Sequence, residues 1–127
     1  MTADRPPRLR LFDILDCIHQ IEVSTSGVNL DTLKSDIVRY RAIERWLEII
    51  SEASRHVGDD LKAREPEIEW KQIADFGNVL RHGYQTIDPL LLRNIIEQDL
   101  APLKAVTARL YASVKTAADP WPDAQPK

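Results

Sequence analysis

The sequence predicts an all-α protein, and within that class an antiparallel four-helix bundle. Apolar residues recur at spacings of three and four through most of the chain, and no segment shows the alternation typical of a strand. Prolines and glycines fall mainly near segment ends, which leaves helical stretches joined by mostly short connections. The length of 127 residues suits one domain. We expect a single helical domain over 1–118 and a disordered, proline-rich tail over 119–127.

The first two helices are predicted from periodicity and from the absence of helix breakers. Residues 8–23 carry a continuous apolar stripe, and the segment at 24–29, STSGVN, is a loop by composition. From 30 to 61 there is no proline, and the single glycine, Gly58, comes near the end. This pattern predicts one long second helix over 30–61.

The third and fourth helices lie in the second half of the chain. A shorter helix is expected over 69–80. The fourth opens with Asp88 as N-cap and Pro89 at the first helical position, and its stripe continues to Val114. Pro102 lies inside this helix and should kink or locally distort it.

Composition excludes several classes of protein. A formal net charge of −3 argues against a generic DNA-coating protein, so we expect no DNA partner. The chain shows no signal peptide and no apolar run long enough for a membrane helix. The lone Cys17 rules out an intramolecular disulfide and a cysteine-based zinc site, and it fits a reducing cytoplasm.

A metal site can be built from carboxylate and histidine side chains that share a helix face. Asp16 and His19 are three residues apart, and Glu52 and His56 are four apart. A di-metal bundle site would need two Glu-x-x-His motifs, and the chain has none. We therefore interpret these pairs as solvated polar faces and expect no bound metal.

The second helix carries many charges, among them the row Glu44, Glu48 and Glu52. The default interpretation of this pattern is an exposed helix face that carries salt bridges. Arg45 and Glu52 are seven residues apart, however, and so stand two turns apart on one face. If that face lined a cleft, the two would offer a cation and a carboxylate to a substrate.

The stretch FGNVLRHGY at 76–84 gathers reactive side chains at a helix end. Asn78 and His82 are four apart and share a face if the helix extends that far, and Arg81 borders the same patch. Gly83 is a plausible left-handed residue that ends the helix. One interpretation is a helix C-terminus whose cation complements the dipole.

The other interpretation of this stretch is cleavage of an RNA backbone without a metal. An imidazole can act as general base on the 2′-hydroxyl or as general acid to the leaving oxygen. Arg and Asn side chains can hold the scissile phosphate and its developing charge. This chemistry needs no cofactor.

Three segments of the chain resemble the HepT-like branch of the HEPN superfamily. They are EWKQIADFGNVLRHGYQTIDPLLLRNIIEQDLAPL at 69–103, AIERWLEIISEA at 42–53 and LRLFDILDCIHQIE at 9–22. Members are small all-helical proteins, and many are ribonuclease toxins of bacterial toxin–antitoxin pairs. Their hallmark is an Arg, then four to six residues of which the first is polar, then a His, often followed by one residue and a Tyr.

The resemblance implies roles for three residues. Asn78 takes the polar position, His82 that of the catalytic histidine, and Tyr84 that of the tyrosine. The resemblance also implies a homodimer in which two motifs form one cleft that cuts RNA. It further implies a partner, a minimal nucleotidyltransferase antitoxin that silences the toxin by attaching AMP to Tyr84.

The chain departs from the family pattern at Gly77, which stands where the arginine should be. Two outcomes are open. Arg81 or Arg45 supplies the missing cation, with Arg81 favoured. Alternatively, the protein has weakened ribonuclease activity and acts as a partner-binding or nucleotide-binding module.

Overall fold

A computed structural model describes residues 5–82 and 89–121, with side chains described for 5–77 and 89–121. Throughout these ranges the regular structure is helical, which confirms the predicted fold class. The α-helices in chain order are α1 (Pro7–Thr25), α2 (Ile37–Ser54), α3 (Asp59–Lys62), α4 (Trp70–His82), α5 (Pro89–Asn94) and α6 (Leu100–Val114). A 3₁₀ helix, η2 (Leu30–Ser35), precedes α2, and a π-helix, η3 (Ile95–Asp99), joins α5 to α6.

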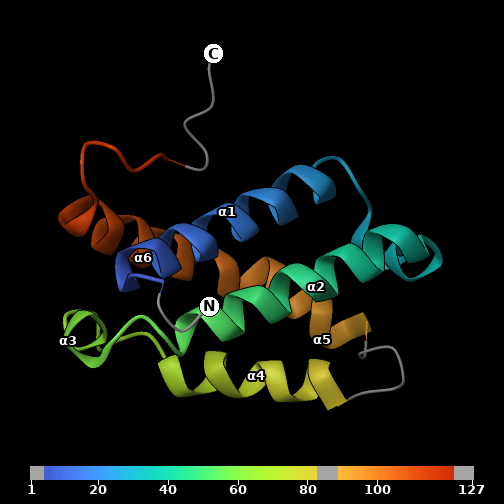
Figure 1. The fold of residues 1–127 in the computed structure, drawn as a ribbon. Helices are drawn as coiled ribbons and strands as arrows, with labels where there is room; N and C mark the ends of the chain where they lie inside the picture. The colour runs from blue at the N-terminus through green and yellow to red at the C-terminus, as the bar shows by residue number, and fades with distance from the viewer. Residues whose placement is uncertain (1–4, 83–88, 122–127) are drawn as a thin grey trace.

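The helices form a bundle in which α2 occupies a central position (Figure 1). α1 packs against both α2 and α6, and α4 packs against the side of α2 that α1 leaves uncovered. Successive long helices run in opposite directions (Figure 1), as expected for short connections. The centre of the core is made of fully buried apolar side chains from α1, α2 and α6, including Leu11, Ile14, Ile18, Ile43 and Tyr111.

The long second helix predicted over 30–61 is divided into three pieces, so that prediction is wrong in its extent. Asp36 is the first break, because its φ of −99° and ψ of 82° are not helical. Its amide closes η2 on the Leu33 carbonyl, and its carboxylate accepts the Arg39 amide at 3.2 Å to cap α2. Gly58, at φ +97°, is the second break and precedes the short α3.

The distortion expected from Pro102 is present in the turn before it. Pro102 has no N–H to donate to the carbonyl of Gln98, four residues earlier. The chain widens there into the π-helix η3, and the Leu100 amide donates to the Ile95 carbonyl, five residues back. The predicted fourth helix is thus α5, η3 and α6 in continuous succession.

The described residues that follow α6 pack against the bundle. Arg8 Nε lies 2.6 Å from an Asp119 carboxylate oxygen, which ties the segment after α6 to α1. The ring of Trp121 meets that of Tyr111 edge to face at 5.1 Å. Aromatic packing of this kind is favourable and offsets the conformational entropy that the segment loses when it is ordered. The rest of the predicted tail, 122–127, lies outside the described residues.

Cys17 is buried in α1, as expected for a small apolar residue. Burial, followed by the nearby Asp16 and Asp13, raises the pKa of its thiol to about 12. The thiol therefore stays protonated near neutral pH. Among the helices that the structure describes, none is both long and apolar enough to cross a membrane.

Candidate functional site

The motif at 78–82 lies on the last turn of α4. The helix extends to His82, so the condition for Asn78 and His82 to share a helix face is met by the backbone. Arg81 also belongs to α4, one position before His82. The side chains of these three residues, and Tyr84 altogether, lie outside the described part of the chain.

Ser51 of α2 anchors α4 through two hydrogen bonds. Its Oγ donates to the Ala74 carbonyl and accepts the Gly77 amide, each at 2.9 Å. Arg55, the residue directly after α2, donates to the same Ala74 carbonyl at 2.7 Å. Ser51 is fully buried. These contacts fix how far α4 is shifted along α2, and therefore where the motif lies relative to α2.

Neither Ser51 nor Arg55 was identified as a site residue from sequence. The one available signal was a small hydroxyl residue at position 51, directly after the apolar run Ile49-Ile50. A serine buried in a helix must find hydrogen-bond partners. Which helix supplies those partners is a property of the packing.

Gly77 is buried at this contact between α2 and α4. Its amide donates to Ser51 Oγ, so its backbone lies directly against α2. The position where the family arginine is expected is therefore part of the interface between two helices of the same chain. A side chain that replaced this glycine would begin at a buried position in that interface.

Arg45 lies on a different side of α2 from this interface. It is six positions from Ser51, a rotation of about 120° around the helix. Its side chain is 67% exposed, and its guanidinium pairs with Glu48 at 2.6 Å. Glu52, the other possible cleft residue, pairs with His56 at 3.1 Å. Because Glu52 is adjacent to Ser51, it comes level with the middle of α4 rather than with its last turn.

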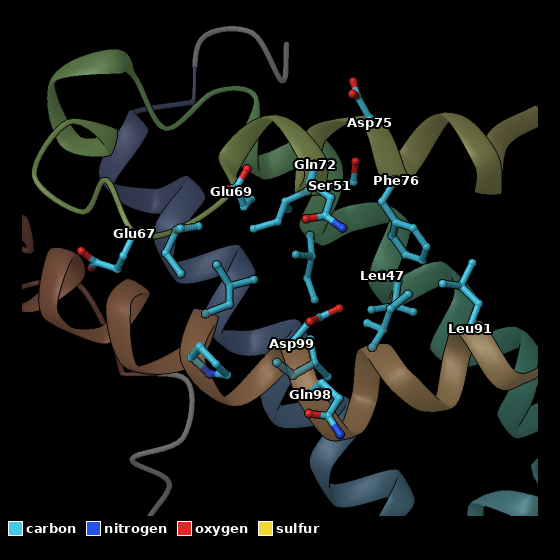
Figure 2. A pocket seen from close by; sticks show the side chains of 17 residues that line it. Leu47, Ser51, Glu67, Glu69, Gln72, Asp75, Phe76, Leu91, Gln98 and Asp99 are labelled. Atoms are coloured by element: carbon cyan, nitrogen blue, oxygen red, sulfur yellow. The ribbon is translucent and has the colours of Figure 1, made fainter.

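A cavity of about 410 Å³ opens between α2, α4 and the segment from α5 to α6. Its walls are mainly apolar, and Figure 2 shows Phe76 extending from α4 toward Leu47, with Leu91 across from them. The charged residues among its described lining are all carboxylates: Glu67, Glu69, Asp75 and Asp99. Asp75 points away from the cavity (Figure 2). A polyanion such as RNA would be repelled here, so this cavity does not suit a scissile phosphate.

The described residues contain no group of three or more His, Cys, Asp or Glu side chains placed to hold a metal ion. Of the pairs considered from sequence, Glu52 of α2 and His56, in the turn just after α2, form a hydrogen bond at 3.1 Å. Both side chains are exposed, as on a solvated polar face.

Comparison with known proteins places the chain in a family. The family model described as ribonuclease HepT-like matches residues 14–110, well over half of the sequence. The chain belongs to the HepT-like ribonuclease family. The match spans α1 to α6, so the described bundle is the fold of the HepT-like part of this chain.

Relatives of this HepT-like chain occur in archaea and bacteria. A Methanocaldococcus jannaschii protein provisionally named as an RNase is 34% identical over 80% of this chain and 94% of its own length. A Thermococcus cleftensis protein provisionally named ribonuclease HepT is 33% identical over 79% of this chain and 91% of its own. A Caldanaerobacter subterraneus protein with a provisional RNase name is 29% identical over 79% and 89%. No solved structure matches the chain.

Proposed function

We propose that this protein is a metal-independent endoribonuclease that acts as a homodimer and forms the toxin half of a toxin–antitoxin pair. The observation that carries the proposal is that α4 extends through the whole motif to His82. Asn78 and His82 therefore stand one helical turn apart at the end of the helix, the spacing that joint action on one phosphate requires. The ribonuclease names of the relatives support the same substrate class.

In the proposed reaction, the 2′-oxygen of a ribose attacks the adjacent phosphorus and the bond from phosphorus to the 5′-oxygen breaks. His82 of one protomer takes the proton of the 2′-hydroxyl, and His82 of its partner donates a proton to the departing 5′-oxygen. Asn78 and an arginine hold the phosphate oxygens as negative charge develops. No redox step or cofactor is involved.

Arg81 is the arginine that we assign to the phosphate. It belongs to the same turn of α4 as His82. Arg45 is less suited, because it is paired with Glu48 about 120° around α2 from the contact with α4. Gly77 is buried against α2 and offers no side chain.

Exposed apolar residues at the same end of the molecule support a dimer. Leu90 and Leu91 at the start of α5 are 62% and 41% exposed, and Ile37 and Val38 at the start of α2 are 52% and 78% exposed. η2, which leads into α2, contacts α5, so both pairs lie at the end of the bundle where α4 finishes (Figure 1). Apolar side chains gathered in this way are typical of protein interfaces.

We further propose that a minimal nucleotidyltransferase silences the toxin in the cytoplasm by attaching AMP to Tyr84. A tyrosine two residues after His82 would carry the added phosphate close to the catalytic histidine. The negative charge of the new phosphodiester and the bulky nucleoside there would exclude the RNA backbone. Co-expression with the nucleotidyltransferase should add the mass of one AMP to the wild type and none to Tyr84→Phe.

The activity is tested with purified protein and single-stranded RNA in the presence of EDTA. We expect the wild type to cleave the RNA and His82→Ala to reduce the rate by at least 10²-fold, the contribution typical of a general acid or base. His56→Ala is the matched control, because His56 lies in the turn after α2 and pairs with Glu52. Equal rates for the wild type and His82→Ala would refute the proposal.

The second candidate function is a HEPN dimer that binds its partner or a nucleotide without cleaving RNA. The burial of Gly77 favours it, since nothing at that position reaches a substrate. Absence of cleavage by the wild type, together with tight binding of the nucleotidyltransferase, would establish this alternative.

A further inference from the structure

The bundle is open along the side between α4 and α6. Among the described residues, α1 packs extensively on α2 and α6, and α2 packs on α4, whereas α4 and α6 make no comparable contact. A four-helix bundle closes its core when each helix packs on two neighbours. Here the cavity of about 410 Å³ takes the place of the fourth contact, and the buried Leu47 and Ile50 of α2 form its base. The cavity is therefore a groove between two helices that lie apart.

One wall of this groove is a face of α4, and the other follows α5, η3 and α6. Gln72, Ile73 and Phe76 line the first wall at spacings of three and four residues, as one face of a helix does. Leu91 and Pro102 mark the ends of the second wall, which is about 16 Å long at 1.5 Å per residue. A groove that is apolar at its base and bounded by two helices suits the apolar face of a third, amphipathic helix.

The charge of the rim indicates which kind of helix fits. Two of the carboxylates on the rim, Glu69 and Asp99, form no ion pair with another described residue, whereas Asp75 pairs with Lys71. Glu69 and Asp99 are both exposed, and they lie on opposite walls of the groove (Figure 2). A helix with positive charges on both sides of an apolar face would therefore complement the base and the rim together.

A second copy of this chain complements the groove less well. In a two-fold contact the same surface meets itself, so a rim of carboxylates would face a rim of carboxylates and one hollow would lie against another. Of the four exposed apolar residues that support the dimer, only Leu91 also lines the groove. The groove and the dimer surface are thus adjacent but separate elsewhere.

We propose that this groove binds an amphipathic helix of a second protein, whose apolar side chains fill the groove and whose flanking Lys or Arg residues pair with Glu69 and Asp99. The bound helix contacts the side of α4 that α2 leaves uncovered, and it closes the open side of the bundle. None of the residues named for the groove belongs to the motif at 78–84. The binding site therefore exists whether or not the protein cleaves RNA.

The test uses the full-length protein and three synthetic peptides of about 16 residues, long enough to span the groove. The first is an amphipathic helix of leucine and lysine, and the second has glutamate in place of every lysine. The third has the composition of the first, in an order that spreads the leucines around the helix. We expect the first peptide to bind at least about 10-fold more tightly than either of the others, because it alone matches both the apolar base and the acidic rim. Fluorescence anisotropy of labelled peptides measures the affinities.

Two double variants with the same change in net charge locate the site. Glu69→Lys combined with Asp99→Lys reverses the charge of the rim and should weaken binding of the leucine–lysine peptide by about 10-fold or more. Asp59→Lys combined with Asp60→Lys is the matched control, because α3 contributes no side chain to the described lining of the groove. Circular dichroism checks that both double variants are folded.

Equal weakening in the two double variants would overturn the proposal, because it would reflect net charge alone. So would a leucine–lysine peptide that binds no more tightly than the reordered one. In NMR spectra of the wild type, peptide-induced shifts should centre on the groove, and shifts confined to 37–38 and 90 would assign the peptide to the dimer surface instead.

The oligomeric state distinguishes a second copy from a second protein. If the wild type is a dimer and Glu69→Lys with Asp99→Lys is a monomer, the groove is an interface between copies and the proposal is wrong. An unchanged oligomeric state supports a separate partner. If the leucine–lysine peptide binds as expected while the wild type cleaves no RNA, the ribonuclease proposal alone fails.

Discussion

Gly77 stands at the position where the HepT-like family has an arginine. A glycine inside a helix costs about 1 kcal/mol relative to alanine. The structure places this glycine at a buried position in the contact between α2 and α4, where its amide donates to the Ser51 hydroxyl at 2.9 Å.

The first prediction concerns Gly77→Arg, the change that restores the family motif. We expect it to destabilise the fold by about 2 kcal/mol, because a long charged side chain must leave or disrupt a buried helix contact. Urea unfolding followed by circular dichroism measures the difference.

The stability and the RNA cleavage of Gly77→Arg have to be measured separately. Arg81→Lys, one turn further along α4 in the same motif stretch, serves as a comparison for stability alone. A Gly77→Arg protein as stable as the wild type would contradict the packing role of the glycine. Any gain in RNA cleavage should be measured at a temperature where the variant is fully folded.

At the scale of single residues, the sequence placed Asn78 and His82 one turn apart, and the backbone of α4 agrees. Ser51 could not have been recognised in this way. Its importance comes from hydrogen bonds to residues 23 and 26 positions away, and a local pattern carries no information on such partners.

At the scale of elements, one polar side chain decides where α2 begins, although the apolar periodicity predicts a longer helix. The apolar stripe runs unbroken across residue 36, which is why one helix was expected over 30–61. Asp36 instead ends η2 and begins α2, because its carboxylate competes for the backbone amide of Arg39. The division brings Ile37 and Val38 to the start of a helix, where both are exposed.

The corresponding prediction is that Asp36→Ala destabilises the protein by about 1 kcal/mol, the usual value of an N-cap. The cap bond to the Arg39 amide and the ion pair with the Arg39 side chain are lost together. Thermal unfolding measures the change, with Ser26→Ala in the loop after α1 as the control. If Asp36→Ala and the control unfold at the same temperature, Asp36 is not what begins α2.

For the molecule as a whole, the two ends of the described chain are joined. Arg8 of α1 pairs with Asp119, and the Tyr111 hydroxyl donates to the Pro120 carbonyl. The hydrogen bond from Arg8, and then that from the Thr116 amide, lower the pKa of the Asp119 carboxyl to about 2 from its ordinary 3.8. The folded state thus favours the ionised form of Asp119.

This shift predicts how stability depends on pH. Because the pKa is lower in the folded protein than in the unfolded chain, the pair stabilises the fold fully above about pH 4 and loses its effect as pH falls toward 2. The difference in urea midpoint between the wild type and Asp119→Asn should therefore shrink over that range. Tryptophan fluorescence is a suitable probe, since Trp121 packs on Tyr111. A difference that stays constant from pH 5 to pH 2 would contradict the assignment.

The sequence by itself determined the helical class, the approximate position of most helices, the spacing of the motif and the likeness to HepT-like proteins. These properties follow from local periodicity, capping residues and short-range spacing. The tertiary structure decided which face of α2 meets α4, that Gly77 is buried there, and that Arg45 lies away from that contact. The reason is physical: the register of two packed helices is set by hydrogen bonds and side-chain packing between distant parts of the chain, and each helix alone is compatible with many registers.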